Sequence, residues 1–204
     1  MADRHTELEF KFDARRVNPE HFVATMTALN PSSYETQGQF DDDYYVRTVD
    51  GLILRHRLLG GAGELTYKRR RSADDLTDRL EINLNFHWNT EVGDVQGFLL
   101  QTGHEKLMTV RKTFAHVFHF VRPDYKVEVA LYGAGILEGW VKDAERRFLE
   151  IEVVGPTMPL EARQVILEDW RALVRHHVPL GPQLNESLYE IYSKQVQPNT
   201  NYHI

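Results

Sequence analysis

Charged and apolar residues alternate strictly in a short run near the start of the chain, Glu-Leu-Glu-Phe-Lys-Phe at residues 7–12. Successive side chains of a β-strand point to opposite faces, so Glu7, Glu9 and Lys11 share one face and the apolar residues take the other. Same-face neighbours lie about 6.6 Å apart, so two glutamates can reach one divalent cation while the lysine reaches an anion beside it. The run fits a metal and phosphate site, and it fits a solvated strand face equally well.

The same alternation recurs in later segments, and the sign of the charged face changes from one segment to another. The basic faces carry Arg55, Arg57, Lys68 and Arg70, and the acidic faces carry Glu128, Glu150 and Glu152. A β-sandwich with its charges toward water would produce this pattern. A barrel turned inside out would also produce it, with charged faces lining a tunnel and apolar faces carrying helices. We favour the barrel, because the amphipathic segment 159–178 needs an apolar surface to cover.

Turn and cap signals divide the chain into alternating strands joined mostly as hairpins, with helices between some of them. We expect helices at 19–29, 90–102, 159–178 and 187–193. We expect strands at 7–12, 40–47, 52–59, 64–71, 79–86, 107–121, 125–132 and 148–154. Eight antiparallel strands can close into a barrel wide enough to hold a small ligand. The predicted fold is therefore α+β, an eight-stranded antiparallel closed β-barrel with helices on its outside, in one domain over 1–196 with a tail at 197–204.

Composition excludes several classes of protein. The chain has 204 residues, no cysteine and a formal net charge of −6. Disulfides, zinc-thiolate sites and thiol nucleophiles are therefore excluded, and a general nucleic-acid-binding surface is not favoured. No apolar stretch approaches the roughly 18 residues of a membrane-spanning helix, and the N-terminus lacks the apolar block of a signal peptide. We expect a cytoplasmic protein.

The order of these motifs resembles that of the CYTH superfamily, also called triphosphate tunnel metalloenzymes, whose N-terminal signature is Glu-x-Glu-x-Lys. Glu7, Glu9 and Lys11 match that signature. Further matching segments follow in the family's order: Tyr44-Tyr45 with Asp50-Gly51, Leu54–Arg57, Leu65–Lys68, Arg79-x-Glu81, Arg111-Lys112, Val127–Leu131, Phe148–Glu152 and Ser187–Tyr189. The resemblance spans nearly the whole chain, and it rests on the series of motifs rather than on one of them.

The resemblance implies an eight-stranded antiparallel tunnel that binds triphosphate compounds together with Mg²⁺ or Mn²⁺. By the family pattern, the metal would be held on an acidic wall formed by Glu7, Glu9, Glu81, Glu128, Glu150 and Glu152. The phosphates would be bound by Lys11, Arg55, Arg57, Lys68, Arg70, Arg111 and Lys112. Glu9, Lys11 and Glu128 would be the catalytic residues. Carboxylates suit hard divalent cations, and arginine offers a two-point fork to phosphate oxygens.

Four positions depart from the family pattern, one of them Asn83, where some members carry another glutamate. Val46 replaces an acidic residue that relatives carry after the Tyr-Tyr pair, and Tyr132 stands where relatives often carry Asp. Tyr132 thins the acidic wall at a second metal position. Lys112 stands where arginine is common, so the charge is kept and the fork is lost.

The leading prediction is metal-dependent hydrolysis of a triphosphate: inorganic triphosphate, thiamine triphosphate or a nucleoside triphosphate. A second hypothesis is that the protein is a class IV adenylyl cyclase. Such cyclases carry a His-Phe element where this chain has Arg4-His5-Thr6, so this hypothesis ranks below hydrolysis. A non-catalytic module that binds nucleotides or polyphosphate is a third. The expected partner is a small molecule; an RNA 5′-triphosphate end is less favoured because basic stripes are lacking. No membrane partner is expected. The sequence does not decide between a monomer and a homodimer.

Overall fold

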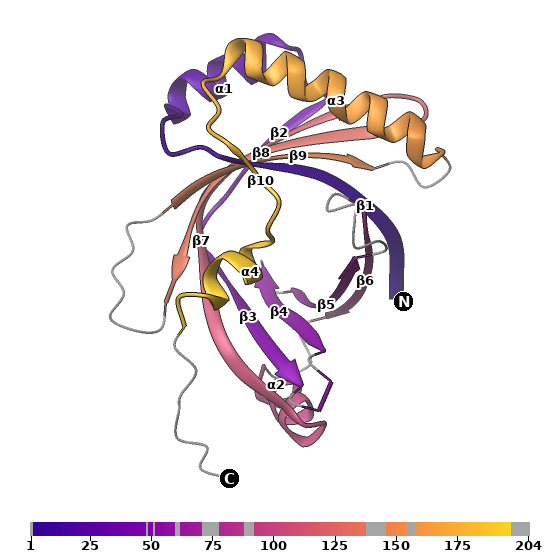
Figure 1. The fold of residues 1–204 in the computed structure, drawn as a ribbon, viewed down its shortest axis with the longest axis vertical. Coiled ribbons are helices and arrows are strands. Elements are labelled where there is room, and N and C mark those ends of the chain that lie inside the picture. Colours follow the sequence, from indigo (N-terminus) through magenta and orange to yellow (C-terminus); the bar gives the residue numbers. More distant parts are fainter. Residues whose placement is uncertain are drawn as a thin grey trace.

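The computed structural model describes residues 2–47, 49–50, 52–59, 62–70, 78–87, 92–137, 146–154 and 158–196. It shows an α+β fold, a ten-stranded antiparallel sheet with four helices (Figure 1). The strands are β1 (Ala2–Asp13), β2 (Ser33–Gln37), β3 (Phe40–Arg47), β4 (Ile53–Leu59), β5 (Ala62–Arg70), β6 (Asp78–His87), β7 (His104–Val121), β8 (Lys126–Ile136), β9 (Arg146–Val154) and β10 (Gln183–Leu184). The helices are α1 (Pro19–Ala28), α2 (Val92–Gln101), α3 (Leu160–His177) and α4 (Leu188–Ser193).

All eight expected strands and all four expected helices are present, and two strands were not predicted. β2 is mostly polar and mostly exposed, and its sequence carries no apolar alternation. It forms because the 18-residue β7 is longer than β3, and the remaining part of its edge, Ala115–His119, pairs with β2. β10 has only two residues, which pair with Lys11 and Phe12 of β1.

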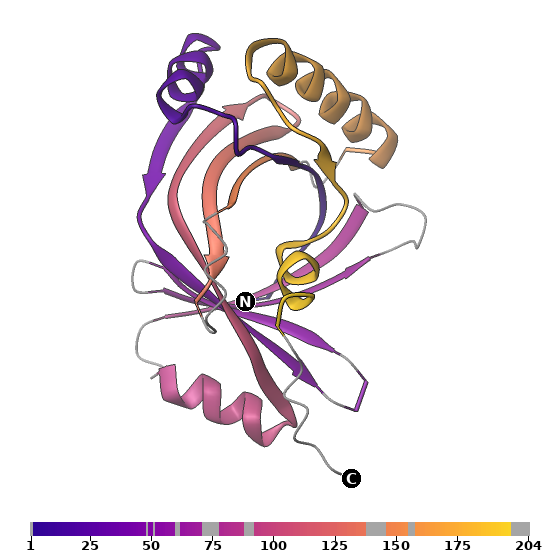
Figure 2. The same ribbon diagram turned by 60° about the vertical axis from the view of Figure 1, so that its left-hand side comes forward.

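The strand order is β10-β1-β6-β5-β4-β3-β7-β8-β9. β1 also pairs with β9, the strand at the other end of this order. The first half of β1 pairs with β6, from Ala2 opposite Leu84 to Leu8 opposite Asp78. Its second half pairs with β9, where Glu9 lies opposite Glu152. The strands therefore curve round until β9 lies beside β1 (Figure 2). This curvature gives the sheet a concave face and an outer face.

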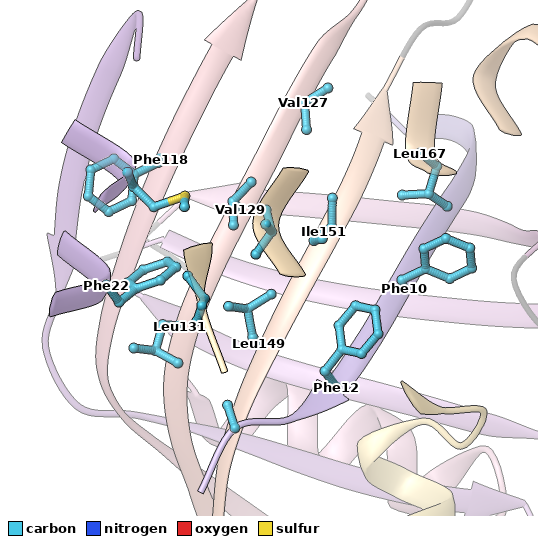
Figure 3. Packing of buried hydrophobic residues seen from close by; sticks show 14 of the residues in the cluster. Phe10, Phe12, Phe22, Phe118, Val127, Val129, Leu131, Leu149, Ile151 and Leu167 are labelled. Atoms are coloured by element: carbon cyan, nitrogen blue, oxygen red, sulfur yellow. The ribbon is translucent and has the colours of Figure 1, made fainter. Parts of the chain in front are cut away.

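The main hydrophobic core lies on the outer face, between the sheet and the helices α1 and α3 (Figure 3). Phe22 of α1, which packs edge-on against Phe118, and Leu167 of α3 are buried there in one cluster with Phe10 and Phe12 of β1. The strands β7, β8 and β9 contribute Phe118, Phe120, Val127, Val129, Leu131, Leu149, Ile151 and Val153. Each such side chain contributes about 1.5–3 kcal/mol when fully buried. The prediction that apolar strand faces carry helices is confirmed.

A second apolar cluster lies on the concave face, where α4 packs. Leu188, Ile191 and Tyr192 of α4 are buried against a group that consists of Tyr44, Met108, Val110, Ala115, Val117, Ala130, Tyr132, Ala134 and Phe148. The Tyr192 hydroxyl donates to the Ala134 carbonyl oxygen at 2.6 Å. A capping box starts the helix, because the Ser187 side chain accepts from the Glu190 N–H while the Glu190 carboxylate accepts from the Ser187 N–H. α4 therefore covers one end of the concave face.

None of the helices in the described ranges is long and apolar enough to cross a membrane.

Candidate functional site

Glu9 and Lys11 of β1 lie on the concave face. Phe10 and Phe12 point into the core on the outer face. Glu9 and Lys11 alternate with them along the strand, so their side chains point to the concave face. Their side chains are only 8% and 5% exposed, respectively. The Lys11 ammonium lies 3.5 Å from Glu9 Oε1. The second half of the Glu-x-Glu-x-Lys strand is therefore not a solvated surface, because the sheet encloses the charged groups of Glu9 and Lys11.

Three glutamates form one row across neighbouring strands. Glu9 of β1 lies opposite Glu152 of β9, and Glu152 in turn lies opposite Glu128 of β8. Residues directly opposite each other in antiparallel strands point to the same face, with Cβ atoms about 4.5–5.5 Å apart. Glu128 Oε2 lies 3.2 Å from Lys126 Nζ and 3.3 Å from His119 Nδ1. We call Glu9, Glu152 and Glu128 the acidic row.

Glu150 precedes Glu152 on the same face of β9, and its neighbours are basic rather than acidic. Its Oε1 lies 3.0 Å from Lys11 Nζ and accepts a hydrogen bond of 2.7 Å from the Tyr132 hydroxyl. Burial alone would raise the pKa of Glu150, but the charges of Lys11 and Lys112 and the bond from Tyr132 lower it. Burial, together with the charge of Glu150, holds the pKa of Tyr132 well above its usual value. Glu150 is therefore ionised and Tyr132 is a hydrogen-bond donor.

Among the described residues, the basic side chains on the concave face include Lys11, Arg55, Arg57 and Lys112. Arg55 Nη2 contacts Glu64 Oε1 at 2.6 Å and Thr66 Oγ1 at 2.9 Å. The Lys112 ammonium lies 4.3 Å from the centre of the Tyr132 ring. Burial, aided by the nearby charge of Arg57, lowers the pKa of Lys112 to about 8. This group, which we call the basic wall, lies next to the acidic row through Lys11.

Asp42 is a site residue that the sequence analysis missed. It is completely buried, and Arg57 binds both of its oxygens, with Nε–Oδ1 at 2.5 Å and Nη2–Oδ2 at 2.7 Å. Burial alone would raise the pKa of Asp42, but the charges of Arg57 and Arg55 hold it well below its usual range. The signal was present in the sequence, because alternation along Phe40–Arg47 puts Asp42 and Tyr44 on one face.

Arg111 is not brought to this site. It neighbours Lys112 on β7, so the two side chains point to opposite faces of the sheet. Arg111 binds Asp41 with two hydrogen bonds, of 2.8 and 2.9 Å, and is about one third exposed. The predicted pairing of Arg111 and Lys112 at the phosphates thus conflicts with strand geometry, and only Lys112 faces the basic wall.

Four predicted site residues have side chains that lie outside the described part of the chain: Glu7, Lys68, Arg70 and Glu81. Their backbones are placed by the strand pairing, in which Glu7 lies opposite Arg79 and Lys68 lies opposite Glu81. The roles expected of these four side chains stay predictions.

The acidic row fits a divalent cation in its chemistry and its register. It offers only carboxylate oxygens, which are the ligands that Mg²⁺ and Mn²⁺ prefer. Within the described ranges, however, no three acidic or histidine side chains converge closely enough to hold an ion. Glu9 and Glu128 instead contact Lys11 and Lys126.

Solved structures of low sequence identity share this fold. The PH1819 protein of Pyrococcus horikoshii OT3 superposes with a TM-score of 0.63 at 16% identity, over 93% of this chain and 99% of that one. A candidate adenylate cyclase of Vibrio parahaemolyticus has a TM-score of 0.62 at 20% identity, over 93% and 98%. The Mimivirus capping-enzyme triphosphatase has a TM-score of 0.50 at 10% identity, over 84% and 90%. No family profile and no curated protein sequence matches the chain. These likenesses establish the fold alone.

Proposed function

We propose that this protein hydrolyses a triphosphate compound with the help of Mg²⁺ or Mn²⁺. In this proposal the strands β1, β6, β5, β4, β3, β7, β8 and β9 form a closed tunnel, and the reaction takes place on the concave face that lines it. The candidate substrates are inorganic triphosphate, thiamine triphosphate and nucleoside triphosphates.

The observation that carries the proposal is the placement of the acidic row beside the basic wall on one enclosed face. Glu9 and Lys11 are almost completely buried there. Buried charges are costly unless they are compensated, and each additional ion pair within the site reduces that cost. A metal ion and a polyphosphate are a pair of ligands of opposite charge, so they satisfy both groups of residues at once. A site for one small neutral ligand would need neither.

In the proposed reaction Glu9, Glu152 and Glu128 would hold the divalent cation, and Glu7, on the same strand as Glu9, would join them. The bound cation would neutralise phosphate charge and lower the pKa of a water molecule. Lys11, Arg55, Arg57 and Lys112 bind the phosphate oxygens and stabilise the charge on the transferring and leaving groups. The enclosed face holds the chain of phosphates in line for attack by water, and no covalent nucleophile is required.

The fold likeness does not separate hydrolysis from cyclisation, because one similar structure is a candidate cyclase and another is a triphosphatase. The products separate them. A hydrolase releases phosphate from inorganic triphosphate, whereas a cyclase acts only on a nucleoside triphosphate and releases pyrophosphate with a cyclic nucleotide.

The test measures phosphate, pyrophosphate and cyclic nucleotide from inorganic triphosphate, ATP and thiamine triphosphate, each with Mg²⁺, Mn²⁺ or EDTA. We expect metal-dependent phosphate release that is lost in Glu9→Gln. The matched control is Glu161→Gln, because Glu161 is exposed on α3. Unchanged activity in Glu9→Gln would contradict the assignment of the acidic row. Tight binding of all three compounds without any product would show a binding module instead.

A further inference from the structure

Glu150 and Glu152 are matched residues with different neighbours. Both are glutamates of β9, two positions apart on the concave face. Glu152 lies in a row with two other glutamates, Glu9 and Glu128. Glu150 lies in a row between Lys11 and Ala130. The strand pairing therefore supplies additional carboxylates beside Glu152 and a cation beside Glu150.

The contacts of Glu150 are those of an anion held by donors. One ammonium and one hydroxyl, from Lys11 and Tyr132, both reach its Oε1, at 3.0 and 2.7 Å. Lys112 adds a second positive charge that acts on the same carboxylate. Two ammonium groups and a hydroxyl form the kind of donor set that binds a phosphate oxygen. A divalent cation on Glu150 would lie among like charges, with no second carboxylate in its row.

We propose that Glu150 is an internal counter-anion that occupies one phosphate subsite in the substrate-free protein, and that it is not a metal ligand. The subsite consists of Lys11, Lys112 and the Tyr132 hydroxyl. This inference rests on the proposed function and divides the acidic wall that the sequence predicted into two parts. The acidic row binds the metal. Glu150 holds the basic side chains in place until a phosphate of the substrate takes over their contacts.

The proposal explains why Tyr132 stands on this part of the concave face. The Tyr132 hydroxyl binds Glu150, its ring lies beneath Lys112, and it is almost completely buried. An acidic residue in its place would add a second negative charge beside Glu150. Tyrosine instead donates a hydrogen bond and offers a ring face to the lysine ammonium. Tyr132 therefore belongs to an anion site.

The first experiment measures Mn²⁺ binding by calorimetry in the absence of any phosphate compound. It compares the wild type with Glu150→Gln and Glu152→Gln, which are the same substitution on the same strand face. We expect the dissociation constant of Glu150→Gln to stay within about twofold of the wild type, and that of Glu152→Gln to rise about tenfold or more, which is the order of loss seen when a metal-site residue is removed. Tyr132→Phe keeps Glu150 and should also bind Mn²⁺ as the wild type does.

The second experiment measures thermal unfolding with inorganic triphosphate in EDTA. Glu150→Gln removes one negative charge from beside Lys11 and Lys112, so the added anion has more positive charge to compensate. We expect the triphosphate-induced rise in Tm to be larger in Glu150→Gln than in the wild type by about 2–4 °C, which corresponds to a severalfold gain in affinity. In Glu152→Gln the rise should match that of the wild type.

A tenfold loss of Mn²⁺ affinity in Glu150→Gln would overturn the proposal, and so would a Tm rise no larger than in the wild type. If Glu150→Gln does not fold, a loss of Mn²⁺ affinity in Tyr132→Phe equal to that in Glu152→Gln would overturn it. The proposed function is judged separately on the wild type. If the wild type binds neither Mn²⁺ nor triphosphate, the proposed function and this inference are both wrong. If it binds the two ligands, the comparison of Glu150→Gln with Glu152→Gln tests this inference alone.

Discussion

Arg57 of β4 and Asp42 of β3 lie directly opposite each other and form a two-point ion pair in which the carboxylate is completely buried. The pair fixes the guanidinium in one orientation on the concave face. A positioned guanidinium binds phosphate with less loss of side-chain entropy than a free one. Asp42 therefore holds Arg57 of the basic wall in position.

Asp42→Asn should destabilise the protein by about 3–5 kcal/mol, because it leaves the partly buried charge of Arg57 without its partner. The control is Asp41→Asn, which breaks the more exposed pair with Arg111 and should cost about 1 kcal/mol or less. Urea unfolding of the two variants measures both values. Equal losses in the two variants would contradict the role given to burial.

Acid should remove the stabilisation that Asp42 provides. The pKa of Asp42 is lowered in the folded protein, by the charges of Arg57 and Arg55 against the effect of burial. An unfolded Asp has a pKa of about 3.9, so the unfolded state takes up the proton first as the pH falls. The contribution is complete above about pH 4 and is lost as the pH falls toward the folded pKa. Urea unfolding of the wild type and Asp42→Asn at a series of pH values measures this effect. The difference between their free energies of unfolding should become smaller below about pH 4.

Lys112 and Arg111 provide a test of strand geometry, since they are adjacent and point to opposite faces. Lys112→Ala should weaken triphosphate binding by about tenfold or more, the loss expected for a charged hydrogen bond. Arg111→Ala should leave binding nearly unchanged, because Arg111 contacts Asp41 on the outer face. Calorimetric titration with inorganic triphosphate compares the two. A larger loss in Arg111→Ala would place the substrate on the other face of the sheet.

Binding should also depend on pH through Lys112. Burial and the charge of Arg57 lower the pKa of this lysine to about 8. Its ammonium is therefore present below pH 8 and is lost above it, so the affinity for triphosphate should fall as the pH rises through 8. Lys112→Arg should remove this dependence, because arginine stays charged throughout. The measurement is the dissociation constant of inorganic triphosphate in EDTA from pH 6.5 to about 9.5. An equally steep fall in Lys112→Arg would assign the titration to another group.

Local sequence patterns were sufficient for much of the fold. The alternation at 7–12 and at 148–154 correctly separated the residues of the outer core from Glu9, Lys11, Glu150 and Glu152. Asn18 and Pro19 marked the start of α1, where the Asn18 side chain accepts from the His21 N–H. These predictions succeed because strand alternation and helix capping depend on neighbours within a few residues.

The pairing of strands depends on residues far apart in the sequence, and local patterns do not contain it. β2 was missed because a polar segment becomes a strand only where the long β7 offers it an edge. Alternation predicts the strand face of Asp42, but its ion pair with Arg57 depends on the β3–β4 register. Arg111 was grouped with Lys112 from a motif, although alternation alone should have separated them.

Local patterns of residues are enough to show which residues share a strand face, where the helices start, and that the charged faces lie opposite apolar ones. Which charged side chains meet depends on how the strands pair in the folded sheet. Glu150 and Glu152 are equivalent in the sequence, as alternate residues of one strand. The register of β1, β9 and β8 places Glu152 between two glutamates and Glu150 beside a lysine. That difference arises because cross-strand neighbours are set by the pairing of the whole sheet, whereas alternation is a property of each strand alone.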